Sequence, residues 1–282
     1  MARLKLTAEN YYSPEANWVY MSKSQFSAFR KCEASAMAEL RGEIGKKDTT
    51  ALLVGSYIDA YFSGEMEQFI AEHPEIFTQK GEKRADFVKA DKAIERLESD
   101  ELSRLLLSGR HQVIKTGKIA GVWFKTKADS LLTSAQVEAI CEKFPEVRNI
   151  VPFGGAMIVD LKYMKDFEDI WDEEEGEKVS FAEYWGYDVQ GAIYQKIDKR
   201  QAPFVLVGVT KETEPDISAM YIPDDDLAVA LSDVEEYAPR YDDIKKGKLE
   251  PVGCGKCAYC RSKKKLNGIT HYKLIGIGSE QL

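Results

Sequence analysis

Hydrophobic residues in the first 110 positions recur three to five residues apart, the spacing of helices that bury one face. This pattern predicts helices over residues 22–40, 49–73 and 83–107. Ser22 and Ser24 stand at the start of the first helix, where a hydroxyl can cap a free backbone amide. We therefore expect a mainly helical layer over residues 22–110.

After residue 110 the pattern changes to alternation and to short apolar runs, which are typical of strands. Residues 111–116 and 119–128 alternate, and Gly117-Lys118 between them fits a hairpin turn. The remaining predicted elements are an inserted helix over 134–149, strands over 156–162, 203–210 and 216–222, and helices over 180–199 and 224–246.

This order of elements predicts an α/β fold in which a mixed central sheet is flanked by helices. No stretch rich in proline, glycine and serine divides the chain, so we expect residues 1–282 to form a single domain. Its expected parts are the helical layer at 22–110, a catalytic sheet core at 111–222, and a C-terminal helix with a cysteine cluster at 224–282.

The composition is that of a globular protein, with 44% hydrophobic and 30% charged residues. No window approaches the roughly 18 consecutive apolar residues of a membrane span, and residues 1–10 lack the apolar core of a signal peptide, so we predict a cytoplasmic protein without membrane partners. The net charge of −8 argues against a protein that coats nucleic acid with a uniformly basic surface. An enzyme that holds DNA in one local basic groove remains compatible with it.

Two charged residues interrupt the apolar strand at 156–162. Asp160 and Lys162 lie two positions apart, so in a strand they share one face. Charges in a buried strand are costly unless they have a function. A carboxylate that binds a hard divalent cation, next to a lysine that positions a water or a phosphate, would be such a function.

Four further polar residues could face the same cleft. Asp129 ends the predicted strand before Asp160 and could approach it across neighbouring strands. Gln190 and Tyr194 are four residues apart and share one face of the predicted helix at 180–199. Asp59 is a lone acid in a largely apolar helix.

The order of these residues resembles the PD-(D/E)xK nuclease superfamily, specifically its phage-type RecE-like and RecB-like exonucleases, from about residue 22 to 262. The resemblance implies a restriction-endonuclease-like core and a Mg²⁺ or Mn²⁺ site formed by Asp129, Asp160 and the carbonyl of Leu161. It implies that Lys162 orients or helps deprotonate the attacking water. Gln190 and Tyr194 match the family's Q-x-x-x-Y, which implies contact with DNA or support of the site. Asp59 stands where related nucleases often carry a metal-binding histidine, and aspartate is also a ligand for Mg²⁺.

The chain has five cysteines, three of them in Cys254-Gly-Lys-Cys257-Ala-Tyr-Cys260. This compact spacing lets one loop supply three ligands of a metal centre, as in ferredoxin-type runs. Cys32 and Cys141 are the candidates for the fourth ligand. Nucleases of the AddB and Cas4 kind pair one N-terminal cysteine with three C-terminal ones around a [4Fe–4S] cluster, and this resemblance implies Cys32 as the fourth ligand. Zinc and unligated thiols remain alternatives.

These features together predict a metal-dependent DNA exonuclease acting on linear duplex or single-stranded DNA. A role in phage or prophage recombination, with a single-strand annealing protein as partner, is implied by the resemblance alone, as is a possible homo-oligomer. Two alternatives remain: an inactive DNA-binding or assembly module that keeps the nuclease fold, and a DNA endonuclease.

Overall fold

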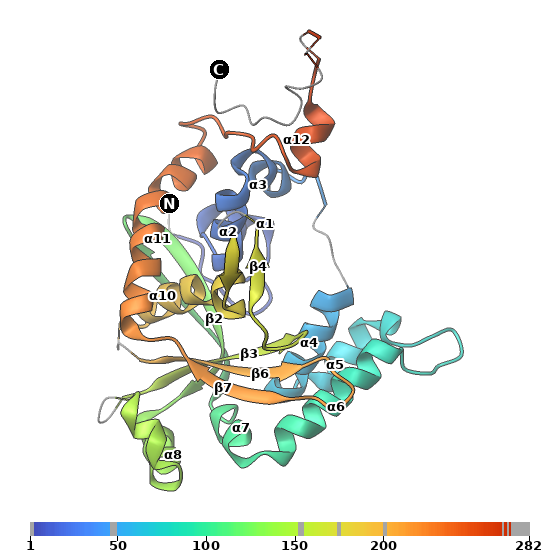
Figure 1. Cartoon of the computed structure of the whole chain (residues 1–282), viewed down its shortest axis with the longest axis vertical. Helices are drawn as coiled ribbons and strands as arrows, with labels where there is room; N and C mark the ends of the chain where they lie inside the picture. The colour runs from blue at the N-terminus through green and yellow to red at the C-terminus, as the bar shows by residue number, and fades with distance from the viewer. Residues whose placement is uncertain are drawn as a thin grey trace.

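A computed structural model describes residues 3–45, 50–151, 155–173, 176–199, 202–266, 268–269 and 271 (Figure 1). The strands are β1 (Arg110–Ile119), β2 (Val122–Leu132), β3 (Met157–Met164), β4 (Ile170–Asp172), β5 (Glu177–Val179), β6 (Phe204–Thr210) and β7 (Ile217–Tyr221). The helices are α1 (Pro14–Val19), α2 (Lys23–Lys31), α3 (Glu33–Leu40), α4 (Thr50–Ser63), α5 (Met66–Glu72), α6 (Ala85–Ser99), α7 (Glu101–Leu106), α8 (Ser134–Lys143), α9 (Phe181–Tyr184), α10 (Tyr187–Asp198), α11 (Asp224–Lys245) and α12 (Ala258–Lys263).

The central sheet has five strands in the order β1-β2-β3-β6-β7. Its pairs are antiparallel except β3 and β6, which run parallel and are joined through α9 and α10. Strand β3 lies in the middle and is apolar on both faces at most positions, which is why its sequence is a nearly continuous apolar run. The predicted mixed sheet with flanking helices is therefore present.

Helices cover both faces of this sheet. Val159 and Leu161 of β3 point into a core shared with α4, α6 and α8. Ile158 of β3 points the other way, into a core shared with α10 and α11. Because side chains alternate along a strand, Asp160 and Lys162 lie on this second face, the one that α10 covers.

Each of the three long helices predicted before residue 110 is broken into two. Cys32 is extended (φ −168°), and its sulfur accepts a hydrogen bond from the Ser35 amide to begin α3. Asp100 begins α7 in the same way through the Ser103 amide, and Gly64 ends α4 with a φ of +76°. The hydrophobic spacing continues across all three breaks, so it predicted longer helices than the structure has.

The hairpin between β1 and β2 turns at Ala120-Gly121, so the predicted turn at Gly117-Lys118 is wrong. Ala120 and Gly121 have φ values of +45° and +83°, as a two-residue hairpin turn requires. Gly117 instead pairs inside the ladder, where a Cβ would lie 3.2 Å from Ile197.

Three further differences concern elements around the sheet. Helix α1 and the small β4–β5 hairpin were not predicted. The segment predicted as one helix over 134–149 is α8 followed by a 3₁₀ turn, Pro145–Asn149, and it leaves the pairing of β2 with β3 intact. None of the helices in the described ranges combines the length and apolar character that a bilayer crossing requires.

Candidate active site

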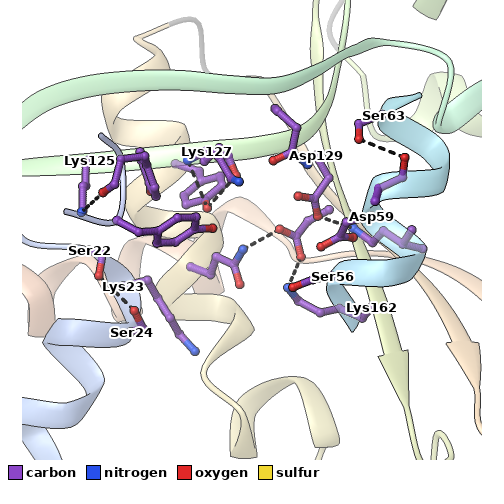
Figure 2. A pocket seen from close by; sticks show the side chains of 18 of the residues that line it. Ser22, Lys23, Ser24, Ser56, Asp59, Ser63, Lys125, Lys127, Asp129 and Lys162 are labelled. Atoms are coloured by element: carbon purple, nitrogen blue, oxygen red, sulfur yellow. Dashed lines mark hydrogen bonds and ion pairs between the residues drawn. The ribbon is translucent and has the colours of Figure 1, made fainter. Parts of the chain in front are cut away.

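One pocket of about 470 Å³ lies where α2, α4, α10, β2 and β3 meet (Figure 2). It collects all the residues that the sequence suggested for the divalent metal and its surroundings, and these come from four separate elements. They are Asp59, Asp129, Asp160, Leu161, Lys162, Gln190 and Tyr194.

The pocket opens where β2 and β3 separate. Their ladder pairs Ser130 with Val159 and goes no further, so the next residues, Asp129 and Asp160, face a gap. The Asp129 carboxylate enters this gap and accepts a hydrogen bond from the Leu161 amide at 2.9 Å. The amide and carbonyl of one strand residue point to the same side, so the Leu161 carbonyl also faces β2. Asp129 was expected at the end of its strand. It lies inside β2, and the separation of the strands lets its side chain enter the pocket.

Asp160 is held from two sides at the floor of the pocket. Its side chain is 2% exposed, and one carboxylate oxygen accepts a hydrogen bond from the side-chain amide of Gln190 at 2.5 Å. Its other oxygen forms an ion pair with the Lys162 ammonium at 2.5 Å (Figure 2). Burial opposes the charge of Lys162, but the neighbouring Asp160 and Asp129 carboxylates prevail and raise its pKa. The lysine therefore stays protonated at neutral pH.

Helix α10 brings Gln190 and Tyr194 to the sheet by a close approach. A Cβ at Gly191 would lie 2.7 Å from the Phe204 ring of β6, so glycine is what lets the helix lie this near. The Tyr194 hydroxyl donates to the Lys127 carbonyl at 3.1 Å and accepts from its amide at 3.4 Å. In this structure both residues therefore contact the site's own strands.

Asp59, Asp129 and Asp160 bring three carboxyl groups into the pocket beside the Lys162 ammonium. Burial raises the pKa of Asp59 to about 7, with the Asp160 carboxylate adding to the shift. Burial and the same neighbour raise the pKa of Asp129 well above its ordinary value. A divalent cation would offset this repulsion, and carboxylate and carbonyl oxygens are the ligands that Mg²⁺ and Mn²⁺ prefer. The donor set at this pocket therefore fits the predicted metal.

The sequence reasoning missed several residues that line the same pocket. Lys127 lies two positions before Asp129 on β2, so the alternation Lys125-Thr-Lys127-Ala-Asp129 contained a signal for it. Its ammonium sits 4.9 Å from the ring centre of Tyr12, which enters the pocket from the segment before α1. The sequence offered no signal for Tyr12.

A second missed cation comes from the start of α2. The Lys23 ammonium donates to the Trp185 carbonyl at 2.6 Å, and its neighbour Ser22 caps the helix through the Gln25 amide. Burial, together with the positive charge of Lys162, lowers the pKa of Lys23 to about 8. Lys23 and Lys162 lie 5.8 and 5.1 Å from the centre of the Tyr187 ring, so both cations border one side of the pocket.

The four cysteines expected to bind a metal gather in a second site. The sulfurs of Cys32, Cys254, Cys257 and Cys260 all lie within 4.8 Å of one another. Backbone amides point at them: that of Cys254 lies 3.4 Å from the Cys32 sulfur, and that of Cys260 lies 3.4 Å from the Cys257 sulfur. Four cysteine sulfurs this close together fit either zinc or an iron–sulfur cluster. Cys141 lies apart, buried on α8.

A charged clamp supports this cysteine site. Glu33, directly after Cys32, accepts two hydrogen bonds from the Arg240 guanidinium of α11 at 2.6 and 2.8 Å. Its carboxylate also accepts from the Val252 amide, just before the cysteine loop, at 2.8 Å. Figure 1 shows α3 and α12 side by side although they come from opposite ends of the sequence.

Comparison with known proteins identifies the class of this fold and site. The model of the family described as "PDDEXK-like domain of unknown function (DUF3799)" matches residues 22–139 and 153–263, and the chain belongs to this family. The predicted membership of the PD-(D/E)xK superfamily is thereby confirmed.

A solved structure is similar over almost the whole chain. It is the crystal structure of a "putative exonuclease" from Eubacterium rectale, with 39% sequence identity and a TM-score of 0.83, covering 98% of this chain and 99% of that one. This likeness confirms the restriction-endonuclease-like fold, and with the family it supports a nuclease. No curated protein matches the chain.

Proposed function

We propose that this protein is a metal-dependent DNA exonuclease. One observation carries the proposal: the gap between β2 and β3 brings Asp129, Asp160 and Lys162 together at the floor of one pocket. The similar structure from Eubacterium rectale is described as a "putative exonuclease", which supports action from DNA ends.

The pocket's oxygen atoms define the metal site of this proposal. Asp129, Asp160 and the Leu161 carbonyl would hold Mg²⁺ or Mn²⁺, with Asp59 as a further ligand. When bound, the ion supplies positive charge to the scissile phosphate and lowers the pKa of a water. Gln190 fixes the Asp160 carboxylate, and Tyr194 fixes β2 next to Asp129. Such supporting contacts hold the ligands in position.

Lys162 acts in this scheme as a hydrogen-bond donor. Its raised pKa keeps it protonated, so it is suited to orient the attacking water or a phosphate oxygen and not to take a proton from the water. Lys127 and Lys23 border the same pocket and add positive charge where a phosphate would enter, although the chain as a whole carries −8.

The cysteine site is proposed to hold a [4Fe–4S] cluster, with zinc as the alternative, in a structural role. It joins the start of α3 to α12 and the loop before it, and these elements differ from those that carry the three carboxylates. Action in phage or prophage recombination beside a single-strand annealing protein, and assembly into a homo-oligomer, belong to the same proposal through the family resemblance.

The test compares linear with covalently closed circular duplex DNA, with and without Mg²⁺. We expect loss of the linear form only, and a reduction of at least about 100-fold in Asp160→Asn, which keeps the side-chain shape but removes the charge. Asp225→Asn, an exposed acid in the first turn of α11, is the matched control and should cleave normally. Cutting of the closed circle would instead establish an endonuclease. No cleavage with either Mg²⁺ or Mn²⁺ would leave a DNA-binding or assembly module.

A further inference from the structure

A second cavity of about 770 Å³ adjoins the candidate active site. Within the described part of the chain both are lined by the same four residues, so they form one continuous groove; these are Tyr12, Asn17, Ser22 and Ser24. The second cavity begins at the N-terminus of α2, next to the candidate active site. It runs past α1 and α3 and ends at the turn formed by Arg41–Gly45. Whatever occupies the second cavity therefore continues directly into the candidate active site.

The residues that line the second cavity suit flat, apolar groups better than charged groups. Its floor carries Ala28, Ala36 and Leu40. The rings of Tyr12 and Trp18 stand at its edge and are 64% and 40% exposed, unusually high for such side chains. Among the residues that the structure describes, the charged ones lining it are Glu39 and Arg41, which have opposite signs.

Tyr12 is held in position despite its exposure. Its ring meets the buried Tyr11 edge-on, with centres 4.9 Å apart, and the Lys127 ammonium lies 4.9 Å from the Tyr12 ring centre. Tyr12 is therefore an aromatic ring held beside a cation, next to the pocket proposed to cleave the phosphodiester bond. Proteins bind unpaired nucleotides with such pairs: the base stacks on the ring and the cation contacts the phosphate backbone.

From this arrangement we infer that the second cavity binds an unpaired stretch of the substrate strand, with bases stacking on Tyr12 and Trp18. This inference rests on the proposed nuclease function and deepens it. In a duplex the base faces are covered by neighbouring base pairs, so aromatic side chains at a groove select single-stranded nucleic acid. The hydroxyls of Ser22 and Ser24, 3.0 Å apart at the junction, lie where the strand passes from one cavity to the other (Figure 2).

The test measures binding without cleavage, by fluorescence anisotropy with Mg²⁺ withheld. The probe is a short labelled oligo(dT), beside an abasic oligonucleotide of the same length and a blunt duplex. We expect Tyr12→Ala and Trp18→Ala each to weaken oligo(dT) binding about 5- to 100-fold, the loss of one stacked base. The abasic and duplex probes should bind the variants as they bind the unmodified protein.

Two controls separate stacking from other effects. Tyr221→Ala removes a tyrosine of similar exposure (51%) from β7, outside both cavities, and should leave binding unchanged. Tyr12→Phe keeps the ring and should keep oligo(dT) binding. Thermal unfolding should show that each variant is folded, since both rings lie on the surface.

Unchanged affinity for oligo(dT) in both alanine variants would overturn the inference, and so would an equal loss for the abasic probe, which would indicate backbone contacts alone. A cavity that binds a protein partner would give the first of these results. Because hydrolysis is not measured, the outcome is distinct from failure of the proposed function. Binding of oligo(dT) that depends on Tyr12, without any cleavage of DNA, would contradict the proposed nuclease function. Cleavage of duplex ends, with oligo(dT) binding that does not depend on Tyr12 or Trp18, would contradict the proposed single-strand site.

Discussion

Gln112 is an uncharged residue outside every motif, yet it lies directly beside Asp129. It lines the candidate active site with a φ of +51°, a conformation that residues other than glycine rarely adopt. The ladder of β1 and β2 pairs His111 with Ser130 and Val113 with Ala128, leaving Gln112 opposite Asp129 without a pair. Backbone strain is thus concentrated next to a carboxylate of the site, where such strain is commonly found.

Replacing Gln112 with glycine should stabilise the protein. Glycine adopts a positive φ without a steric penalty, although it gives the unfolded chain more freedom, so we expect a net gain of about 0.5–1 kcal/mol in the free energy of unfolding. Denaturant unfolding measures it. Gln112→Ala keeps the unfavourable φ and should show no such gain. Equal stability of the two variants would mean that the native chain carries no strain at this position.

Single residues of the site differed in how visible they were in the sequence. Asp160 and Lys162 could be predicted because charges two apart in an apolar run must share a buried face. Lys127 carried the same period-two signal relative to Asp129 and was missed. Tyr12 and Gln112 could not have been found, because one depends on how the N-terminal segment folds back and the other on a local backbone distortion.

At the scale of elements, the sequence predicted where the helices and strands lie, except α1 and the β4–β5 hairpin, but not where they stop. The breaks at Cys32, Gly64 and Asp100 leave the hydrophobic period intact, so tertiary contacts and capping groups decide them. The break at Cys32 has a consequence for the site. It ends α2 and turns the thiol toward the C-terminal cysteines, while the start of α2 carries Ser22 and Lys23 to the pocket.

Helix α11 is tied to the N-terminal segment by a buried lysine. The Lys245 ammonium donates to the carbonyls of Asn17 and Tyr20 at 2.8 and 3.1 Å and to the Gln25 side chain at 2.7 Å. All three acceptors are neutral. Burial lowers the pKa of Lys245 to about 7, and the positive charge of Lys125 acts in the same direction against the charge of Asp242.

Because of Lys245, the free energy of unfolding should increase as the pH rises above 7. Unfolded, Lys245 remains protonated up to its ordinary pKa of 10.5, whereas in the folded protein it loses the proton from about pH 7 upward. The unfolded state then binds more protons, so the free energy of unfolding rises with pH above 7, by at most about 1.4 kcal/mol per pH unit.

Denaturant unfolding at pH 7, 8 and 9 tests this with Lys245→Met, which fills a similar volume without a charge. The difference in unfolding free energy between the unmodified protein and the variant should grow across this range. Lys89→Met, at an exposed position of α6 that does not affect the pKa of Lys245, is the matched control, and its pH profile should follow that of the unmodified protein. A difference that stays constant with pH would show that Lys245 keeps the same charge in both states.

Across the whole molecule, the cysteine site closes the chain on itself. Cys32 directly follows α2, whose start borders the pocket, and its three partners come more than two hundred positions later. The sequence made this site visible because three thiols within seven residues are a strong local signal, and family resemblance selected Cys32 over Cys141. The structure places Cys32 with the other three and Cys141 on α8, which spacing alone could not decide.

A metal bound by these thiolates would link the two ends of the fold, so its loss should lower the stability of the whole chain. Cys260→Ser replaces a soft thiolate with a hydroxyl, a poor ligand for iron or zinc. Metal binding by thiolates contributes several kcal/mol to folding, so we expect the melting temperature to fall by about 5 °C or more, with loss of the bound metal. Metal and sulfide analysis of anaerobically purified protein, with visible absorption, distinguishes an iron–sulfur cluster from zinc.

Cys141→Ala is the matched control for this prediction, because it removes a buried thiol that lies outside the cysteine site. It should lower the melting temperature through lost packing while leaving the metal content unchanged. The two variants therefore separate a packing effect from a metal effect even where their melting temperatures are similar. Full metal content in Cys260→Ser would mean that Cys260 is not a required ligand. No metal in the unmodified protein would mean that the four sulfurs are held together by the fold alone. The clamp of Glu33 with Arg240 would then be what joins α3 to α11.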